Sequence, residues 1–195
     1  MIVQLVERLA AGGVTEVVLA LGFRPEPFAE VFTGDRCGDV RIRYAVEPEP
    51  LDTGGAIAFA ARHVGADDTF LVANGDIITD LDVARLVTAH RDLGTDATIH
   101  LTPVADPSAF GVVETDADRR VLRFVEKPSP GETTSNLINA GTYVFEPSVL
   151  DLVDEGARVS VERVVFPALV DDGRLGALAT DDYWIDAGRP DLYLQ

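Results

Sequence analysis

Several residue types that mark common classes of protein are scarce in this sequence. Cys37 is the only cysteine among 195 residues, so the chain can form neither an internal disulfide nor a cluster of thiolate metal ligands. No apolar run approaches the length that spans a bilayer, and the first residues contain an acid and no cleavage site for a leader. We therefore expect a cytoplasmic protein with no membrane partner.

Positive charge is also scarce. The formal net charge is −17 and the sequence has no basic run, which argues against nucleic acid as a partner, because no cluster of cations could displace its counterions. Small anionic substrates are still compatible, since a few local cations or a carboxylate-bound divalent metal can hold them. Of the 16 basic residues only Lys127 is a lysine, which makes this position informative.

The spacing of apolar residues in the first half predicts an α/β domain. Helices alternate with short apolar strands, a pattern typical of a parallel sheet covered by helices on both faces. The apolar run at residues 14–21 predicts a buried parallel strand. Helices are expected at residues 2–11, 25–33, 56–63 and 83–93, and strands at residues 14–21, 40–46 and 70–73.

The second half changes rhythm near residue 95 and predicts an antiparallel or mixed extension of the same sheet. Short polar turns separate its strands, and no linker divides it from the first half. Ligands of such sheets bind beyond the carboxyl ends of the strands. Strands are expected at residues 97–104, 110–114, 121–127, 139–145, 175–180 and 183–185, and helices at residues 148–154 and 161–170.

Two aspartates near expected strand ends form the first candidate site. Asp76 follows the strand at 70–73, and Asp186 follows the strand at 183–185. If these strands are neighbours, the two carboxylates can hold one Mg²⁺ that takes its other ligands from water and phosphate. Both aspartates can equally be turn or helix-cap residues, and their spacing alone favours neither interpretation.

A second candidate site lies where Glu126 and Lys127 place an acid beside an ammonium group, just before Pro128. A lysine is a compact point charge that suits a phosphate group, whereas an arginine is a planar fork. A surface ion pair at a strand end is the competing interpretation, and it is the more common one for an arbitrary sequence. Only the surrounding motifs can distinguish a phosphate-binding lysine from a surface ion pair.

Three glycines and an asparagine complete the candidates. Gly54 and Gly55 precede the helix at 56–63, where their N–H groups could approach a base or a phosphate, although a tight turn at a helix start explains them equally well. Gly111 lies inside a strand, which usually marks a bulge or a close backbone approach. Asn139 could read hydroxyl groups with its amide, or it could be a turn residue.

Six short segments occur along the chain in this order: LDTGGA at 51–56, NGD at 74–76, FGVV at 110–113, FVEKP at 124–128, NLINAG at 136–141 and WIDAGRP at 184–190. In this order they resemble motifs of the sugar-1-phosphate nucleotidyltransferases. The likeness is nearest to mannose-1-phosphate guanylyltransferases, with thymidylyltransferases and uridylyltransferases as near relatives, and the sequence does not identify the base or the sugar. The resemblance implies a GT-A-like, Rossmann-related fold and a transferase of sugar nucleotide biosynthesis that joins a nucleoside triphosphate to a sugar 1-phosphate, as in GDP-mannose synthesis, and releases pyrophosphate.

The resemblance also implies roles for individual residues. Asp76 and Asp186 would bind the catalytic Mg²⁺, Lys127 would neutralise the phosphate of the sugar 1-phosphate, and Glu126 would accept hydrogen bonds from sugar hydroxyls. These roles agree with an in-line displacement at phosphorus, which depends on positioning and charge neutralisation rather than on a covalent residue. The residues that would line the sugar pocket are Gly111 and Asn139, and those near the base are Glu47, Gly54 and Gly55.

The resemblance is incomplete at the N-terminus. The family opens with a strand, a glycine-rich loop that wraps the triphosphate and a Pro-Lys-Pro segment, whereas Met1 falls in the helix that follows them. The sequence therefore predicts a single nucleotidyltransferase domain at 1–195 that is truncated relative to the family, lacks the first strand and releases very little pyrophosphate. Asp52 is a milder departure, because many relatives have glycine there.

Two interpretations of this departure stay open. The chain is either an enzyme whose true start lies upstream, or a catalytically weak paralogue that binds a sugar nucleotide or pairs with a complete homologue as a regulatory subunit. A homo-oligomer is compatible with both. A third interpretation is a GT-A glycosyltransferase that uses the turn at 74–76 for its metal, and transfer of sugar without pyrophosphate chemistry would favour it.

Overall fold

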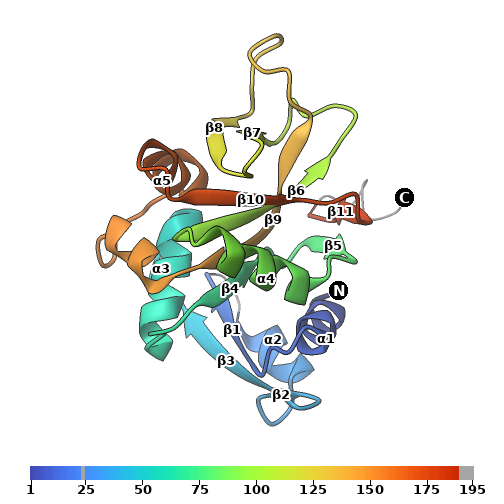
Figure 1. Ribbon diagram of the computed structural model, residues 1–195. Coiled ribbons are helices and arrows are strands. Elements are labelled where there is room, and N and C mark those ends of the chain that lie inside the picture. The colour runs from blue at the N-terminus through green and yellow to red at the C-terminus, as the bar shows by residue number, and fades with distance from the viewer. Residues whose placement is uncertain (23–24, 189–195) are drawn as a thin grey trace.

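The computed structural model describes residues 1–22 and 25–188. Its N-terminal part contains a small three-stranded sheet (Figure 1). β1 (Glu16–Leu21) pairs in parallel with β3 (Val40–Val46), and β2 (Arg36–Cys37) adds an antiparallel edge. α1 (Ile2–Ala11) and α2 (Glu26–Val31) contribute apolar side chains to the core of this sheet. The buried residues of this core are Val6, Leu19, Leu21, Phe32, Val40 and Ile42.

A six-stranded mixed sheet forms the larger part of the molecule (Figure 1). β9 pairs antiparallel with β4, β6 and β7; β10 lies parallel to β6, and β8 pairs with β7. β4, β6 and β10 therefore run in one direction, and their carboxyl ends meet at one edge of the sheet. The strands are β4 (Phe70–Ala73), β6 (Ala97–Pro103), β7 (Gly111–Thr115), β8 (Val121–Glu126), β9 (Leu137–Phe145) and β10 (Leu175–Ala179).

Helices cover both faces of this sheet. On one face, α3 (Asp52–Val64) and α5 (Phe166–Asp171) pack on the main core, which contains Tyr143 and Phe145 of β9. On the other face, α4 (Val83–Leu93) packs on Val144 and Leu178, because side chains alternate along each strand. No helix of the described residues is long and apolar enough to cross a bilayer.

The predicted mixed α/β architecture with helices on both faces is confirmed, although most strand pairs are antiparallel. The helix expected at 56–63 begins earlier, at Asp52, and the helix expected at 148–154 is a 3₁₀ helix that begins one residue earlier, η1 (Pro147–Leu152). The helix expected at 161–170 starts as a π-helical turn, η2 (Val161–Val165), before α5. Pro167 explains this change, because it has no N–H to continue a regular helical hydrogen-bond pattern.

The first strand is less buried than the sequence suggests. β1 lies parallel to β3 as predicted, yet Glu16 and Ala20 are exposed while Leu19 and Leu21 are buried. Among the described residues β3 is its only strand partner, so the other edge of β1 carries no ladder of hydrogen bonds. An apolar run therefore predicted the strand correctly but not its burial.

Candidate active site

Asp76 and Asp186 lie side by side, although the strands that the sequence placed before them are not neighbours, because β4 pairs with β9. Asp76 precedes β5 (Ile77–Thr79), which pairs antiparallel with β11 (Trp184–Asp186), so Asp186 lies opposite Ile77. The Ala187 N–H donates to the main-chain oxygen of Asp76 at 2.8 Å. The two aspartates are thus held together by main-chain pairing, which is independent of any ligand.

Gly188 leaves room for both carboxylates. A methyl group on its Cα would lie 2.6 Å from Oδ2 of Asp76 and 3.1 Å from Oδ1 of Asp186. The Gly188 N–H donates to the same Asp186 oxygen at 2.9 Å. Both carboxylates therefore border one small space that only a glycine leaves open. Residues 189–190 of this motif lie outside the described residues.

This pair of carboxylates fits a divalent cation that is only partly coordinated by protein. Oxygen ligands suit hard divalent cations, and two carboxylates leave the remaining positions to water or to a phosphate. No group of three or more His, Cys, Asp or Glu side chains suited to a metal occurs in the described part of the chain. A cation held here would therefore present open positions to an anionic ligand, while metal binding itself stays a prediction.

Glu126 and Lys127 lie at the end of β8, beside the start of β7. Glu126 pairs with Gly111 across the hairpin, and the Lys127 N–H donates to the Phe110 oxygen at 3.0 Å. Lys127 Nζ lies 3.9 Å from Glu126 Oε1, and 64% of the lysine side chain is exposed. The ammonium group is therefore free to meet a ligand, because its one ion pair within the described residues is long and open to solvent.

Gly111 makes room for the Glu126 carboxylate. A Cβ at this position would lie 2.5 Å from Cζ of Phe124 and 3.0 Å from Oε2 of Glu126. The sequence suggested that the backbone at Gly111 closely approaches another group, and the groups it approaches are the side chains of Phe124 and Glu126. Any larger residue at position 111 would displace the Phe124 ring or the Glu126 carboxylate, so Gly111 allows both side chains to lie against this strand.

Burial raises the pKa of Glu126, and the nearby charge of Glu162 raises it further, while Lys127 lowers it. A carboxylate that is partly withdrawn from water and faces another acid is an effective hydrogen-bond acceptor, because few water molecules compete for it. The acid at the end of β8 is therefore poised to bind hydroxyl groups rather than to remain fully hydrated.

We expect Glu126→Gln to raise the melting temperature at pH 7. The raised pKa means that the folded protein binds this proton more tightly than the unfolded chain, so ionised Glu126 lowers the free energy of unfolding above that pKa. The variant's gain should be full at neutral pH and should vanish below the ordinary pKa of glutamate. Calorimetry across pH should show at most about 2–4 °C, the shift that about 1 kcal/mol produces in a domain of this size. A gain that is independent of pH would contradict this origin.

Asn139 uses both ends of its amide inside the protein. Its Nδ2 donates to the hydroxyl of Tyr143 at 2.9 Å, and its Oδ1 accepts the Gly141 N–H at 2.9 Å. Tyr143 is buried, and burial raises the pKa of its hydroxyl, with the charges of Glu162 and Glu126 adding to the effect. The amide retains one further donor and one further acceptor position, so Asn139 can still meet a ligand while it fixes β9.

An irregular segment of β9 joins the two halves of the site. The register against β6 shifts next to residues 140–142, and the Gly141 oxygen accepts the Asn74 N–H at 2.8 Å. The indole N–H of Trp184 donates to the Ala140 oxygen at 2.9 Å, and its ring packs edge-on against Phe110 at 5.6 Å. Trp184 therefore connects β11, which ends at Asp186, to the residue before Gly111.

Gly54 and Gly55 lie inside the first turn of α3 instead of preceding it. Their N–H groups donate to the Val159 oxygen at 2.8 and 3.0 Å, and a Cβ on Gly55 would lie 2.5 Å from the Ala157 oxygen. These glycines allow close packing of two main-chain segments, so the two N–H groups are already engaged. A role near a base, which the resemblance implies, would have to come from other atoms of this turn.

Asp52 and Glu47 shape the entry to this turn. Asp52 has a φ of 62°, a left-handed conformation that glycine adopts freely and aspartate tolerates. Its Oδ1 accepts the Thr53 N–H at 2.8 Å. Glu47 accepts the Leu51 N–H at 2.9 Å through Oε2, and its other oxygen faces Gly22. Within residues 1–22 and 25–188, Glu47 therefore has one carboxylate oxygen without a hydrogen-bond donor.

The sequence did not single out Glu162, which lies in the π-helical turn η2. Its Oε2 accepts hydrogen bonds from the hydroxyls of Thr53 at 2.7 Å and Ser160 at 2.8 Å. Its charge raises the pKa values of Glu126 and Tyr143, so it lies close enough to both side chains to affect their ionisation. The only available signal was the Ser-Val-Glu spacing at an expected helix start, which is common in helix caps.

Comparison with known proteins gives a consistent set of relatives. A family model described as nucleotidyl transferase matches residues 1–195. The chain is 40% identical over 193 residues to mannose-1-phosphate guanylyltransferase of Mycobacterium tuberculosis, covering 98% of the chain and 53% of that protein. It is 41% identical over 199 residues to the mannose-1-phosphate guanyltransferase of Hypocrea jecorina, covering 100% and 54%. The chain thus spans about half the length of these curated relatives.

Solved structures agree with this likeness. HddC from Yersinia pseudotuberculosis has a TM-score of 0.82 and 29% identity, covering 98% of the chain and 81% of HddC, and it has also been solved in complex with GMP-PN. A UDP-glucose pyrophosphorylase complexed with UDP-glucose has a TM-score of 0.86 at 15% identity, covering 99% of the chain and 83% of that protein. The second similarity supports the fold alone.

Proposed function

The chain belongs to the nucleotidyl transferase family, and from this premise we propose that it carries the site at which a nucleotidyl group passes from a nucleoside triphosphate to a sugar 1-phosphate. The proposal rests on one observation: two acidic side chains and one basic side chain come together around β9. Asp76 and Asp186 border one space at Gly188, and Trp184 connects them to the strand pair that ends at Lys127.

We propose GTP and mannose 1-phosphate as the substrates. The support is the identity of about 40% to proteins named for mannose-1-phosphate guanylyl transfer, together with the guanine nucleotide analogue bound to HddC. Glu47 suits the base, because its second carboxylate oxygen, which accepts no hydrogen bond from the described residues, can accept hydrogen bonds from a purine that carries N–H donors. The sugar hydroxyls would meet Glu126, whose carboxylate lies against Gly111.

The reaction is an in-line displacement. A phosphate oxygen of the sugar 1-phosphate forms a bond to the α-phosphorus of the triphosphate, the bond from that phosphorus to the bridging oxygen breaks, and pyrophosphate leaves with the electron pair. Lys127 offsets the negative charge of the attacking phosphate, so two anions can approach each other. Glu126 and Asn139 fix the sugar, which orients the attacking oxygen.

Asp76 and Asp186 would hold the divalent cation, which we take to be Mg²⁺. When bound, this cation supplies charge neutralisation at the phosphates of the nucleotide. The chain contributes two carboxylates in a fixed arrangement, since main-chain pairing of β5 with β11 sets their separation. No nucleophilic side chain is needed for this chemistry.

A thermal-shift panel of sugar nucleotides tests this proposal. Ligands that bind only the folded state raise the melting temperature, and saturation at about 100 times the dissociation constant contributes about 2.7 kcal/mol. GDP-mannose should produce a larger shift than UDP-glucose or dTDP-glucose, and Mg²⁺ should increase it. Transfer is measured as pyrophosphate release from GTP with mannose 1-phosphate, and the low release that the sequence predicts for this chain should fall further in Asp76→Asn. A chain that no sugar nucleotide stabilises, or release that continues in Asp76→Asn, would contradict the proposal.

A further inference from the structure

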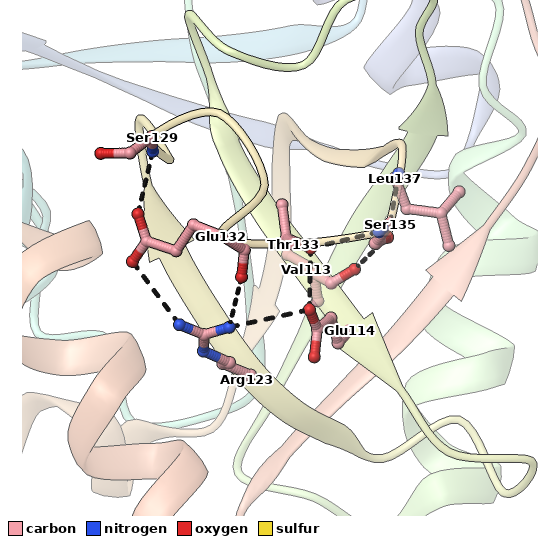
Figure 2. A network of polar contacts seen from close by, with 8 residues as sticks. All are labelled: Val113, Glu114, Arg123, Ser129, Glu132, Thr133, Ser135 and Leu137. Carbon is pink, nitrogen blue, oxygen red and sulfur yellow. Dashed lines mark hydrogen bonds and ion pairs between the residues drawn. The ribbon is translucent and has the colours of Figure 1, made fainter.

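A network of polar contacts fixes the loop at 128–136, which joins β8 to β9, to the β7–β8 hairpin (Figure 2). Glu132 occupies its centre. Glu132 Oε2 accepts the Ser129 N–H at 2.9 Å, and Oε1 lies 3.5 Å from Nη2 of Arg123. Arg123 Nη1 also donates to the main-chain oxygen of Glu132 at 2.9 Å. Glu132 therefore joins a residue of β8 to a residue of the loop.

The far end of the loop is fixed to the same hairpin. Thr133 donates through its hydroxyl to Oε1 of Glu114 at 2.7 Å, and Ser135 donates to the Val113 oxygen at 2.7 Å (Figure 2). Glu114 Oε1 also lies 3.9 Å from Arg123 Nη1. The loop is thus held to both strands of the hairpin, and of these contacts the one from the Ser129 N–H to Glu132 is nearest to Lys127 in the sequence.

Lys127 has a backbone conformation that needs this support. Its φ is 52°, in the left-handed region that is unfavourable for residues with a Cβ, so its surroundings must hold it there. The Lys127 N–H is fixed by the Phe110 oxygen at 3.0 Å. On the other side Pro128 has no N–H, so the first main-chain donor after Lys127 is that of Ser129, which Glu132 accepts.

We propose that Glu132 is a positioning residue for Lys127. It joins Ser129, two residues after the lysine, to Arg123, four residues before it, and so holds the left-handed turn that directs the ammonium group to the Glu126 side of the hairpin. The function of this turn is to present one fixed positive charge to the phosphate of a sugar 1-phosphate, which rests on the proposed function. The ion pair with Arg123 is exposed and contributes little, so the hydrogen bond from Ser129 carries the effect.

The conformational part of the proposal is tested without any ligand, because Lys127 is the only lysine. Protein labelled with ¹³C,¹⁵N-lysine gives one set of lysine signals, whose Cα and Cβ shifts report the left-handed conformation. Glu132→Ala should move these shifts towards extended values or broaden them, whereas Glu132→Gln keeps an acceptor for Ser129 and should leave them near the wild type. Lysine signals that are identical in Glu132→Ala and wild type would overturn the proposal.

Glu16→Ala is the matched control. Glu16 also forms exposed ion pairs with arginines, at 3.5 Å to Arg41 and 3.4 Å to Arg43, but on the three-stranded sheet. The Glu16→Ala variant loses the same number of atoms as Glu132→Ala and a similar ion pair, so it should leave the lysine signals unchanged. A shift in this variant equal to that in Glu132→Ala would mean that the signals follow surface charge in general, which would also overturn the proposal.

Binding of mannose 1-phosphate, measured by calorimetry, tests the consequence. Glu132→Ala should weaken it about 5-fold, while in a Lys127→Ala background the same change should alter it less than about 2-fold, because coupled residues are not additive. Equal losses in both backgrounds would show that Glu132 acts through something other than Lys127. If the wild type binds no sugar 1-phosphate while Glu132→Ala still displaces the lysine signals, the proposed function fails and the positioning role stands.

Discussion

The Lys127→Ala variant should bind mannose 1-phosphate about 10–100-fold more weakly than the wild type, which is the loss of about 1.5–3 kcal/mol expected for a hydrogen bond to a charged group. Its melting temperature should hardly change. The lysine side chain is 64% exposed, and its ion pair with Glu126 at 3.9 Å is too long and too exposed to stabilise the fold appreciably. Alanine and lysine also share the same backbone cost at a φ of 52°.

Two further variants separate charge from structure. Lys127→Arg keeps the charge but replaces a compact ammonium with a planar fork, so it should recover only part of the affinity. Arg41→Ala removes an exposed cation from the three-stranded sheet and should leave the affinity unchanged. Titration calorimetry gives the affinities and differential scanning calorimetry the stabilities. A Lys127→Ala protein that binds normally but melts much lower would assign the residue to the fold instead of the site.

Elements with local signals were predictable from the sequence. The helix expected at 83–93 is α4 (Val83–Leu93), because an apolar period is combined there with two end signals. Asp82 caps its start by accepting the Arg85 N–H, and Gly94 ends it in the left-handed conformation. Each of these signals lies within a few residues of the structure it determines, so no knowledge of the rest of the fold was required.

Pairings between distant strands were not predictable in the same way. β4 was expected in a parallel sheet with its sequence neighbours, yet it pairs antiparallel with β9, about 70 residues later in the chain. The shift in register next to residues 140–142 depends on contacts from Asn74 and Trp184, which lie on other elements. Local spacing contains no information about such contacts, because they form only when the sheet is assembled.

Some residues of the candidate site were likewise predictable from the sequence, and others were not. Strand ends and rare residues pointed to Asp76, Asp186 and Lys127, because the chemistry of these residue types is visible in the sequence. Gly188 matters because β5 and β11 bring two carboxylates together next to it. Glu162 accepts a hydrogen bond from the hydroxyl of Thr53, which lies 109 residues away in the sequence. Convergence of this kind is a property of the fold.

The Asp186→Asn variant should lose the stabilisation that Mg²⁺ gives to the wild type in the presence of GDP-mannose. Loss of a residue that only supports a metal ligand weakens metal affinity about 10–100-fold, and loss of a ligand should cost at least as much. Without metal the variant should melt at the same temperature as the wild type or slightly higher, because two carboxylates that border one space repel each other. The wild type should therefore melt at a higher temperature than the variant only when Mg²⁺ is added.

Gly188→Ala tests the geometry without removing a charge. Its methyl group would lie 2.6 Å from Asp76 Oδ2, so that carboxylate must move, and the response to Mg²⁺ should fall as in Asp186→Asn. Asp181→Asn, an exposed aspartate in the segment before β11, is the matched control and should respond like the wild type. Titration of Mg²⁺ followed by the melting temperature compares the three variants. A normal response in both Asp186→Asn and Gly188→Ala would place the metal elsewhere, since the one change removes a ligand and the other closes the space between the two carboxylates.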